Sequence, residues 1–390
     1  MSLTVGEFVD TFPPNLDGVG NVTLAYCQTL KTMGHTAYYI APDSPLCTQT
    51  YDIPLLLSKS LHFPGEQFRA GVPMLDAEYR EKLDQIPFDI VHCHSPFLAA
   101  HEAIRVAHKR NIPVVSTFHS KYYDDFYAKT HSHSMAKVLT ENLIKVYNRC
   151  DAVWSLNAAT AEVLHSYGYE GNILIMENGT NLEYLEPEVE SEMRARLKLQ
   201  QGVPVLLFVG QHNYKKNLHG VLGAAAILKK QQHPFRLILA GDGPDFDAIV
   251  KESVSLGISD ECTFMGFVSD RQELLSLYRI ADLFVFPSLY DNAPMVLREA
   301  ASMGTPGLLV KGSCSAEGIA DGVNGYISPD ESAQSIAETI LRALPTVDTV
   351  GLEAQKTVPV SWSTIMEKVV IEYEKLINGH VASRRRFIKA

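Results

Sequence analysis

The chain has 390 residues, of which 46% are hydrophobic and 20% are charged. Its length exceeds that of most single domains and its composition is that of a globular protein, so we expect two domains. The formal net charge of −11 argues against general nucleic-acid binding, and no run approaches the ~20 apolar residues of a membrane-spanning helix.

The N-terminal residues and the cysteines predict a cytoplasmic protein. The first residues contain neither a basic region nor a small-residue cleavage site. The six cysteines are scattered without a C-x-x-C pair, which favours reduced thiols over disulfides or a zinc site. Two basic clusters are either solvated faces or contacts with an anionic membrane surface, at the inner face of the cell membrane. Their residues are Arg105, His108, Lys109 and Arg110, and Arg384, Arg385, Arg386 and Lys389.

In the first half of the chain, β-rich runs alternate with amphipathic stretches of helix length. Strands are expected at 3–10, 35–42, 88–97, 112–119, 151–157 and 172–179, helices at 21–34 and 98–111, and an irregular stretch between 43 and 87. This alternation predicts βαβ units and a parallel sheet covered on both faces. We therefore predict an N-terminal Rossmann-like domain over residues 1–182.

After a polar, acid-rich stretch at 183–194 the pattern restarts. Five further strands are expected at 203–210, 235–243, 261–267, 281–288 and 305–312. The predicted fold class is therefore α/β, with a second Rossmann-like domain over 200–360 and the two domains facing across a cleft. In such sheets ligands bind outside the carboxyl ends of the strands, so the residues after each strand are candidates for function.

The glycines after the first strand do not form a nicotinamide-binding fingerprint. Gly18 and Gly20 lack the third glycine of the G-x-G-x-x-G pattern, and they follow a proline-containing loop instead of a tight turn. They suit a loop that opens a helix, where backbone amides can approach a phosphate.

Three histidines follow expected strands in the first half. His92 and His94 are two positions apart on one strand and so share a face. With His119 they either pack and form hydrogen bonds, contact a polar ligand, or bind a metal, although no carboxylate or cysteine completes an obvious metal-binding set. His119 follows a buried-looking strand and is expected to point into the cleft.

Two lysines follow the first strand of the second half. Lys215 and Lys216 lie just past Gly210, where they either neutralise a bound diphosphate or form a surface pair in a polar loop. Further along, Phe267 and Val268 follow the third strand, where an aromatic base can lie against the loop.

Two acids flank a predicted helix start. Asp291 and Glu299 are separated by seven residues, and Pro294 suits the first helical position, which makes Asn292 or Ala293 the N-cap. The amides of Met295 and Val296 would then face an anion, and Glu299 on the second turn would lean back toward them. Acids near helix starts are also common for dipole reasons alone.

Taken together, these motifs resemble the retaining glycosyltransferases of family 4, which have the GT-B architecture. The resemblance is carried by "FVGQHNYKKN", "AGDGP", "FMGFVSDRQELLSLYRIADLFVFPSLYDNAPMVLREAASMGTP" and "EGIADGVNGYIS". In the first half, "FPPNLDGVGNVTLAYCQTLKTMG" and "DIVHCHSPFLAAHEAIRVAHKRNIPVVSTFHSKYYDDFY" are similar to the branch that glycosylates diacylglycerol and other membrane lipids. Residues 361–390 resemble the C-terminal helix that packs back on the N-terminal domain.

The resemblance implies a nucleotide-diphosphate sugar as donor, usually a UDP-sugar such as UDP-glucose, and no required metal or other cofactor. It implies transfer by front-face displacement to an acceptor, lipid or saccharide, with retained anomeric configuration. The implied catalytic residues are Asp291 beside the donor sugar, His119 on the same sugar, and Lys216 at the diphosphate. Glu299 is implied to bind the ribose. The implied donor-binding set comprises Gly18, Val19, Gly210, Gln211, Lys215, Phe267, Val268, Asn292, Ala293, Met295, Val296 and Glu299.

Three positions depart from the family pattern. Asp291 is one methylene shorter than the usual glutamate, Gln211 replaces an arginine, and Pro294 replaces a glycine and so removes one backbone donor. Lys215 is a candidate to compensate for the missing arginine. These departures leave an inactive or regulatory relative open. Two further alternatives are a sugar-nucleotide-binding protein without turnover and another GT-B enzyme such as a UDP-sugar epimerase.

Overall fold

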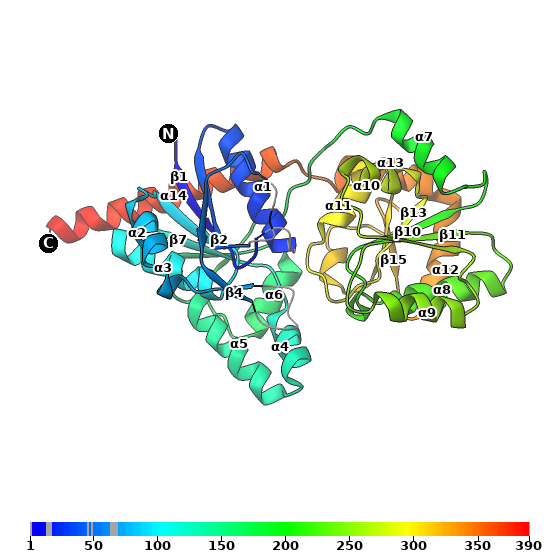
Figure 1. Cartoon of the computed structure of the whole chain (residues 1–390), viewed down its shortest axis with the longest axis horizontal. Helices are drawn as coiled ribbons and strands as arrows, with labels where there is room; N and C mark the ends of the chain where they lie inside the picture. The colour runs from blue at the N-terminus through cyan, green and yellow to red at the C-terminus, as the bar shows by residue number, and fades with distance from the viewer. Residues whose placement is uncertain (1, 13–17, 45–46, 48–49, 63–68, 390) are drawn as a thin grey trace. The chain divides into compact units, whose positions relative to one another are not determined.

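The computed structural model describes residues 2–12, 18–44, 47, 50–62 and 69–389, with side chains described as far as Val381. The chain forms two compact units, one of residues 1–178 and 362–390 and the other of residues 179–361. Figure 1 shows the elements of both. Most of the expected loop before Gly18, and the side chains of the C-terminal basic cluster, lie outside the described residues.

The N-terminal unit is built on a parallel sheet. Within its described part, seven strands lie in the order β3-β2-β1-β6-β7-β8-β9. The strands are β1 (Thr4–Phe8), β2 (Thr36–Pro42), β3 (Leu55–Ser58), β6 (Ile90–Cys93), β7 (Val114–Phe118), β8 (Ala152–Ser155) and β9 (Ile173–Ile175), and a separate antiparallel pair is formed by β4 (Ser60–His62) and β5 (Arg69–Gly71). The central strands β6 and β7 are buried throughout, as expected for a sheet covered on both faces.

Helices cover this sheet. They are α1 (Gly18–Thr32), α2 (Ala77–Gln85), α3 (Leu98–Arg110), α4 (Tyr122–Thr130), α5 (His133–Tyr147), α6 (Ala158–Ser166) and α14 (Trp362–Lys389), with a short 3-10 turn η1 (Pro73–Leu75). The last helix, α14, packs against α1 and buries Ile365, Met366, Val369 and Tyr373 in the N-terminal unit. A segment more than 300 residues away in sequence therefore completes the core around β1.

The second unit, of which every residue is described, repeats the design. Its parallel sheet has six strands in the order β12-β11-β10-β13-β14-β15. They are β10 (Val205–Val209), β11 (Arg236–Ala240), β12 (Cys262–Gly266), β13 (Leu283–Val285), β14 (Gly307–Val310) and β15 (Tyr326–Ser328). The chain order reverses between β10 and β13, which makes the carboxyl ends of these two strands the switch point of the sheet.

In sequence, one helix of this unit precedes its first strand, four lie between strands, and two follow its last strand. They are α7 (Pro187–Arg196), α8 (Leu218–Lys230), α9 (Phe246–Ser255), α10 (Arg271–Ile280), α11 (Met295–Ser302), α12 (Ala333–Ala343) and α13 (Val347–Thr357), with 3-10 turns η2 (Tyr214–Lys216), η3 (Cys314–Ala316) and η4 (Leu344–Thr346). No helix among the described residues is long and apolar enough to cross a membrane.

The predicted class, an α/β chain with two Rossmann-like parts, is confirmed, while several elements differ from expectation. The described part of the stretch at 43–87 is not irregular, since it holds three strands of three or four residues and the nine-residue helix α2. The acid-rich stretch at 183–194 contributes to helix α7, which begins at Pro187. A sixth strand, β15, was not expected. Each of these elements is too short to show a clear hydrophobic period.

Candidate functional site

The switch point of the second sheet brings two predicted site residues together. Lys216 ends η2 after β10, and Asp291 follows the neighbouring strand β13. The Lys216 Nζ lies 2.5 Å from Asp291 Oδ1, and the Ser288 hydroxyl donates to Asp291 Oδ2 at 2.6 Å. The ammonium also lies 5.4 Å from the centre of the Phe286 ring. Only 15% of the lysine side chain and 16% of the aspartate side chain are exposed, so the charges meet in a partly desolvated setting.

The backbone beside this pair is tightly folded. Gly210 donates its amide to Ala240 at 3.0 Å. A Cβ on Gly241, whose φ is +134°, would lie 2.0 Å from the Gly210 carbonyl oxygen, so only glycine fits there. Gln211 is exposed, and the Lys215 Nζ lies 5.1 Å from the centre of the Tyr290 ring. The loop after β10 therefore presents the exposed Gln211 and one further lysine next to the pair.

The start of α11 differs from its prediction in one detail. The N-cap is Pro294, with extended backbone angles, and not Asn292 or Ala293. Proline lacks an N–H and therefore suits a helix start, but here its ψ of 126° delays the helix by one residue to Met295. The amides of Met295 and Val296 still belong to the first turn, where no backbone acceptor is available to them within the helix.

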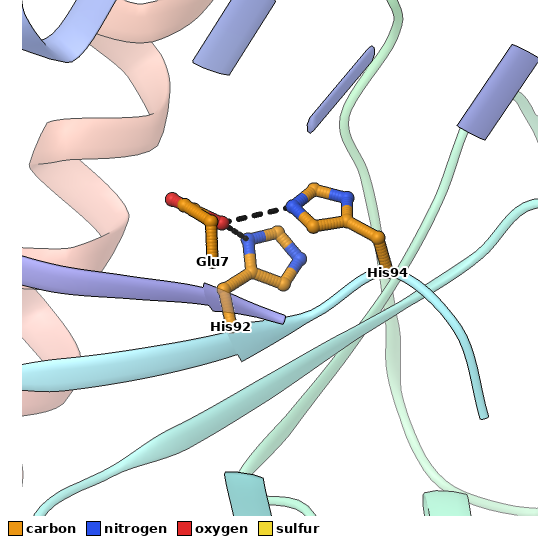
Figure 2. A group of neighbouring side chains, drawn as sticks. All are labelled: Glu7, His92 and His94. Atoms are coloured by element: carbon orange, nitrogen blue, oxygen red, sulfur yellow. Dashed lines mark hydrogen bonds and ion pairs between the residues drawn. The ribbon is translucent and has the colours of Figure 1, made fainter. Parts of the chain in front are cut away.

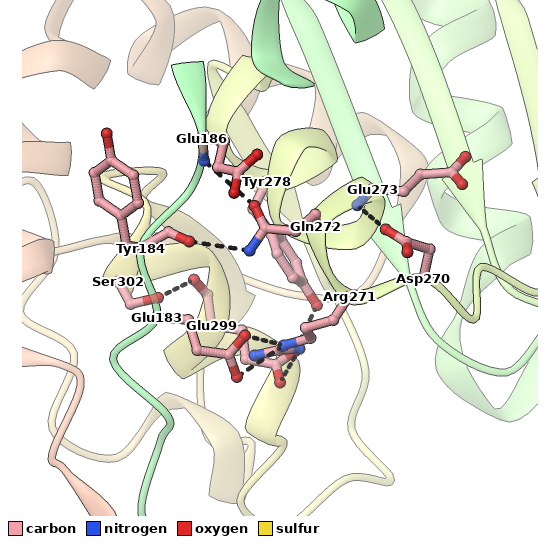
Figure 3. A network of polar contacts seen from close by, with 10 residues as sticks. All are labelled: Glu183, Tyr184, Glu186, Asp270, Arg271, Gln272, Glu273, Tyr278, Glu299 and Ser302. Atoms are coloured by element: carbon pink, nitrogen blue, oxygen red, sulfur yellow. Dashed lines mark hydrogen bonds and ion pairs between the residues drawn. The ribbon is translucent and has the colours of Figure 1, made fainter. Parts of the chain in front are cut away.

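Glu299 lies on the second turn of α11, as predicted, and its carboxylate is held by two groups that the sequence did not single out. Arg271 donates to Glu299 Oε1 at 2.8 Å, and the Tyr278 hydroxyl donates to Oε2 at 3.0 Å. Arg271 also contacts Glu183 at 3.1 Å (Figure 3). Burial lowers the pKa of Arg271, but Glu299 and Glu183 outweigh it and raise the pKa above its ordinary value. The two contacts fix the direction of the carboxylate.

The remaining predicted residues of this unit differ in exposure. Phe267, directly after β12, is 78% exposed, so its ring is available for a planar ligand. Val268 is half-buried and packs against the core of the unit. The structure thus separates the two neighbours into one accessible and one structural side chain.

In the N-terminal unit, Gly18 and Val19 form the first turn of α1. The helix begins at Gly18, three residues before the expected start, and the Val19 carbonyl accepts a hydrogen bond from the Thr23 hydroxyl at 2.9 Å. Gly18 is exposed. The described part of α1 therefore opens at an exposed glycine, and contact of its amides with a ligand stays a prediction.

The three histidines belong to one buried hydrogen-bonded group that includes a carboxylate. Glu7 Oε2 lies 2.8 Å from His94 Nε2, and His94 Nδ1 lies 3.2 Å from His119 Nε2. Figure 2 shows the Glu7 carboxylate beside both rings, with one contact to His92 and one to His94. The expectation that no carboxylate accompanies the histidines is wrong, because Glu7, the last residue but one of β1, pairs in register with His92 of β6 and contacts His94.

Glu7, His92 and His94 place ligand-type atoms within 4.8 Å of one another, the spacing of a metal site. Each is nevertheless already paired. Tyr373 donates to Glu7 Oε1 at 3.1 Å and lies 2.6 Å from His92 Nδ1, while His92 Nε2 lies 2.7 Å from the Thr117 hydroxyl. Because these polar atoms satisfy one another and are fully buried, we interpret the group as a hydrogen-bonded chain and not as a metal centre.

Burial controls the protonation of this group. It raises the pKa of Glu7 from 4.5 to about 8, an effect that the hydrogen bond from Tyr373 partly offsets. It lowers the pKa of His94 from 6.5 to about 3, and it lowers the pKa values of His92 and His119 well below the ordinary range. Near neutral pH the group is therefore mainly uncharged, with the proton on Glu7.

Glu7→Gln is expected to stabilise the fold increasingly as the pH rises. The unfolded chain loses the Glu7 proton near pH 4.5, whereas the folded chain keeps it to about pH 8. Between these values the unfolded state binds fewer protons than the folded state. The free energy of unfolding of the unaltered protein therefore falls by about 1.4 kcal/mol per pH unit relative to that of Glu7→Gln. Thermal unfolding of both proteins from pH 4.5 to 9 should show a gap that widens up to about pH 8 and then stays constant. The matched control, Glu141→Gln at an exposed site on α5, should show no such widening.

The first basic cluster is largely neutralised. Arg105 and Lys109 contact Asp84 at 2.9 and 2.5 Å, and Arg105 also contacts Glu102. Arg110 bonds to the backbone of Asp84. These contacts favour the solvated-face interpretation of this cluster over a membrane contact.

Two family models match the chain in succession. Residues 16–184 match the model described as Glycosyltransferase Family 4, and residues 189–346 match Glycosyl transferases group 1. Together they span most of both units.

Curated relatives and solved structures agree with these models. The chain is 25% identical over 316 residues to an alpha-monoglucosyldiacylglycerol synthase of Streptococcus pneumoniae, covering 78% of this chain and 70% of that protein. It is 23% identical to a GDP-mannose-dependent alpha-mannosyltransferase of Corynebacterium glutamicum, covering 83% and 76%. The fold is similar to that of Anabaena HepE in complex with UDP-glucose, with a TM-score of 0.76, 18% identity, and 96% and 100% of the two chains covered. The chain therefore belongs to the group 1 glycosyltransferases of family 4, with the GT-B architecture, and is a glycosyltransferase.

Proposed function

We propose that this glycosyltransferase transfers a hexosyl unit from a UDP-sugar to an acceptor hydroxyl with retention of the anomeric configuration. The observation that carries the proposal is the pair of Lys216 and Asp291 at the switch point of the second sheet. A cation there suits a diphosphate, and a carboxylate beside it suits sugar hydroxyls. A UDP-sugar as donor is also supported by the solved complex of the structural neighbour HepE with UDP-glucose.

In the proposed reaction, the bond between the anomeric carbon and the diphosphate oxygen breaks, and the acceptor oxygen bonds to the same face of that carbon. The acceptor proton passes to the departing diphosphate. Lys216 and the first-turn amides of α11 stabilise the negative charge that develops on this leaving group, which is typically the largest contribution in such a site. Because a side-chain cation and backbone amides supply this stabilisation, we propose that turnover needs no metal ion.

The other predicted residues take supporting roles in this proposal. Asp291 and His119 contact the donor sugar, Glu299 binds the ribose, and the exposed ring of Phe267 lies against the base. Lys215 supplies a second positive charge in place of the arginine that Gln211 replaces. The assignments of His119, Gly18 and Val19 depend on the family resemblance.

A membrane lipid is the proposed acceptor, since the Streptococcus pneumoniae relative is named for a glycosylated diacylglycerol. We accordingly propose a cytoplasmic enzyme in peripheral contact with the inner face of the membrane. Product analysis after incubation with UDP-sugars and diacylglycerol-containing vesicles tests this acceptor. Transfer to soluble saccharides alone would contradict it.

The donor is tested by thermal unfolding with a panel of nucleotide diphosphates and their sugars. Binding of a ligand at 100 times its Kd stabilises a protein by about 3 kcal/mol, so UDP should raise the melting temperature measurably. A response to GDP alone would contradict the proposed donor, and no response to any of them would contradict the proposed function. Binding without release of UDP, or an isomerised sugar, would instead indicate the two alternatives of a binding protein and an epimerase.

A further inference from the structure

A continuous chain of hydrogen bonds connects Glu7, in the core of the N-terminal unit, to His119. The strands β1, β6 and β7 are parallel neighbours, so their carboxyl ends bring Glu7, His94 and His119 into one row. The two distances along the row are 2.8 Å and 3.2 Å. Glu7 and His94 are fully buried, and His119 is only 7% exposed, so water does not compete along the row.

The direction of every hydrogen bond in the row depends on one proton. When Glu7 is protonated, its Oε2–H donates to His94 Nε2. A neutral His94 then carries its own proton on Nδ1 and donates to His119 Nε2. Since Nε2 of His119 is accepting, the neutral ring of His119 carries its proton on Nδ1.

When Glu7 loses that proton, both hydrogen bonds in the row reverse direction. Ionised Glu7 accepts from His94 Nε2–H, which leaves His94 Nδ1 bare and able to accept from His119 Nε2–H. His119 Nδ1 is then a hydrogen-bond acceptor. The two states differ by one proton, which passes along the row and leaves from His119 Nδ1 as the charge appears on Glu7.

We propose that Glu7 is a positioning residue which, through His94, sets the nitrogen of His119 that carries the proton and thereby whether His119 donates to or accepts from a sugar hydroxyl of the donor. This inference rests on the proposed function in its assignment of His119 to the donor sugar. The group that hydrogen-bonds one ring nitrogen of a histidine commonly fixes which of the two nitrogens carries the proton.

Of Glu7 and the described groups that face it, only Glu7 is expected to titrate near neutral pH. They are His92 and His94 of β6, Tyr26 and Cys27 of α1, and Tyr373 of α14. Burial and the charge of Glu7 raise the pKa values of Tyr26, Cys27 and Tyr373 well above their ordinary range, and burial lowers the pKa values of the histidines. Among these described neighbours, Glu7 alone changes charge between pH 6 and 9, with its pKa raised to about 8.

The test is a histidine-selective ¹⁵N NMR titration of the full chain, in which protonated and bare ring nitrogens give distinct signals. His119 is assigned from the spectrum of His119→Gln. In the unaltered protein, His119 should carry its proton on Nδ1 at pH 6 and on Nε2 above about pH 8. In Glu7→Gln it should keep the Nδ1 proton throughout, because the glutamine amide donates to His94 Nε2 at every pH.

Tyr373→Phe is the matched variant. It removes a hydrogen bond to the other oxygen of Glu7 and leaves the row intact, so the change of tautomer should persist with its midpoint at higher pH. A His119 tautomer that does not change with pH in the unaltered protein, or that changes equally in Glu7→Gln, would overturn the inference. So would one equivalent of tightly bound metal in the purified protein, measured by plasma mass spectrometry.

Binding measurements separate this inference from the proposed function. The Kd for the UDP-sugar should change by about twofold to tenfold across the transition in the unaltered protein and stay constant in Glu7→Gln, the effect of one neutral hydrogen bond. The Kd for UDP, which lacks the transferred hexose, should not change across the transition in either protein. If no nucleotide binds at all, the proposed function fails while the NMR titration still decides the role of Glu7.

Discussion

Lys216→Ala is expected to lower kcat for sugar transfer by about 10²–10³-fold, the typical loss when one group that stabilises a developing anion is removed. The lysine is the side-chain cation that directly contacts Asp291, and in the proposed reaction it faces the departing diphosphate. Its loss also weakens binding of UDP, so the rise in melting temperature caused by UDP should shrink. Steady-state kinetics with a UDP-sugar and thermal unfolding with UDP measure the two effects.

The fold itself should tolerate this substitution. Because only 15% of Lys216 and 16% of Asp291 are exposed, breaking the pair should cost more than the loss of a surface ion pair, on the order of 1–3 kcal/mol, with Asp291 keeping the hydrogen bond from Ser288. The matched control is Lys230→Ala, which removes an exposed lysine at the end of α8 and should leave both kinetics and binding as they are. A Lys216→Ala protein with kcat within tenfold of the parent would show that the diphosphate is stabilised elsewhere.

The sequence predicted this part of the site because its determinants are local. Gly210, Lys216 and Asp291 each follow a strand with a strong hydrophobic run, and parallel strands bring such residues to one edge of a sheet. The sequence indicated only that Lys216 and Asp291 follow two separate strands. The order β10-β13 in the sheet makes the two residues neighbours.

The buried groups were missed because their partners are remote. Glu7 lies inside β1, where a single acid gives no sign of its surroundings, and Tyr373 lies 281 residues from His92. Arg271 opens helix α10 as an ordinary charged residue after its N-cap Asp270, and only the packing of α10 beside α11 shows that it holds Glu299. Pairings of this kind depend on tertiary contacts that no periodicity reveals.

Glu299→Gln is expected to weaken binding of UDP by about 10–100-fold while leaving kcat nearly unchanged. Hydrogen bonds to a charged group contribute about 1.5–3 kcal/mol, and each 1.4 kcal/mol corresponds to a factor of ten in Kd. In the proposed site Glu299 binds the ribose, which is distant from the reacting bond. Its contribution is therefore equal in the ground state and the transition state and should appear in KM.

The contacts of Glu299 make this substitution informative. Glutamine keeps the volume of the side chain, but only its amide oxygen can accept a hydrogen bond, so one of the two bonds from Arg271 and Tyr278 is lost together with the charge. Arg271 retains Glu183 as a partner, which limits the loss of stability. Glu190→Gln, which removes a surface carboxylate paired with Arg194, is the matched control and should leave the Kd for UDP unchanged.

A comparison of the two variants distinguishes a role of Glu299 in binding UDP from a role at the reacting bond. Titration calorimetry with UDP and kinetics with the UDP-sugar should give a Glu299→Gln protein with raised Kd and KM, in contrast to the Lys216→Ala protein with lowered kcat. A Glu299→Gln protein that binds UDP normally but turns over slowly would instead place Glu299 at the reacting bond. The network of Arg271 and Tyr278 would then orient a catalytic carboxylate, and Asp291 would lose its assigned role beside the donor sugar.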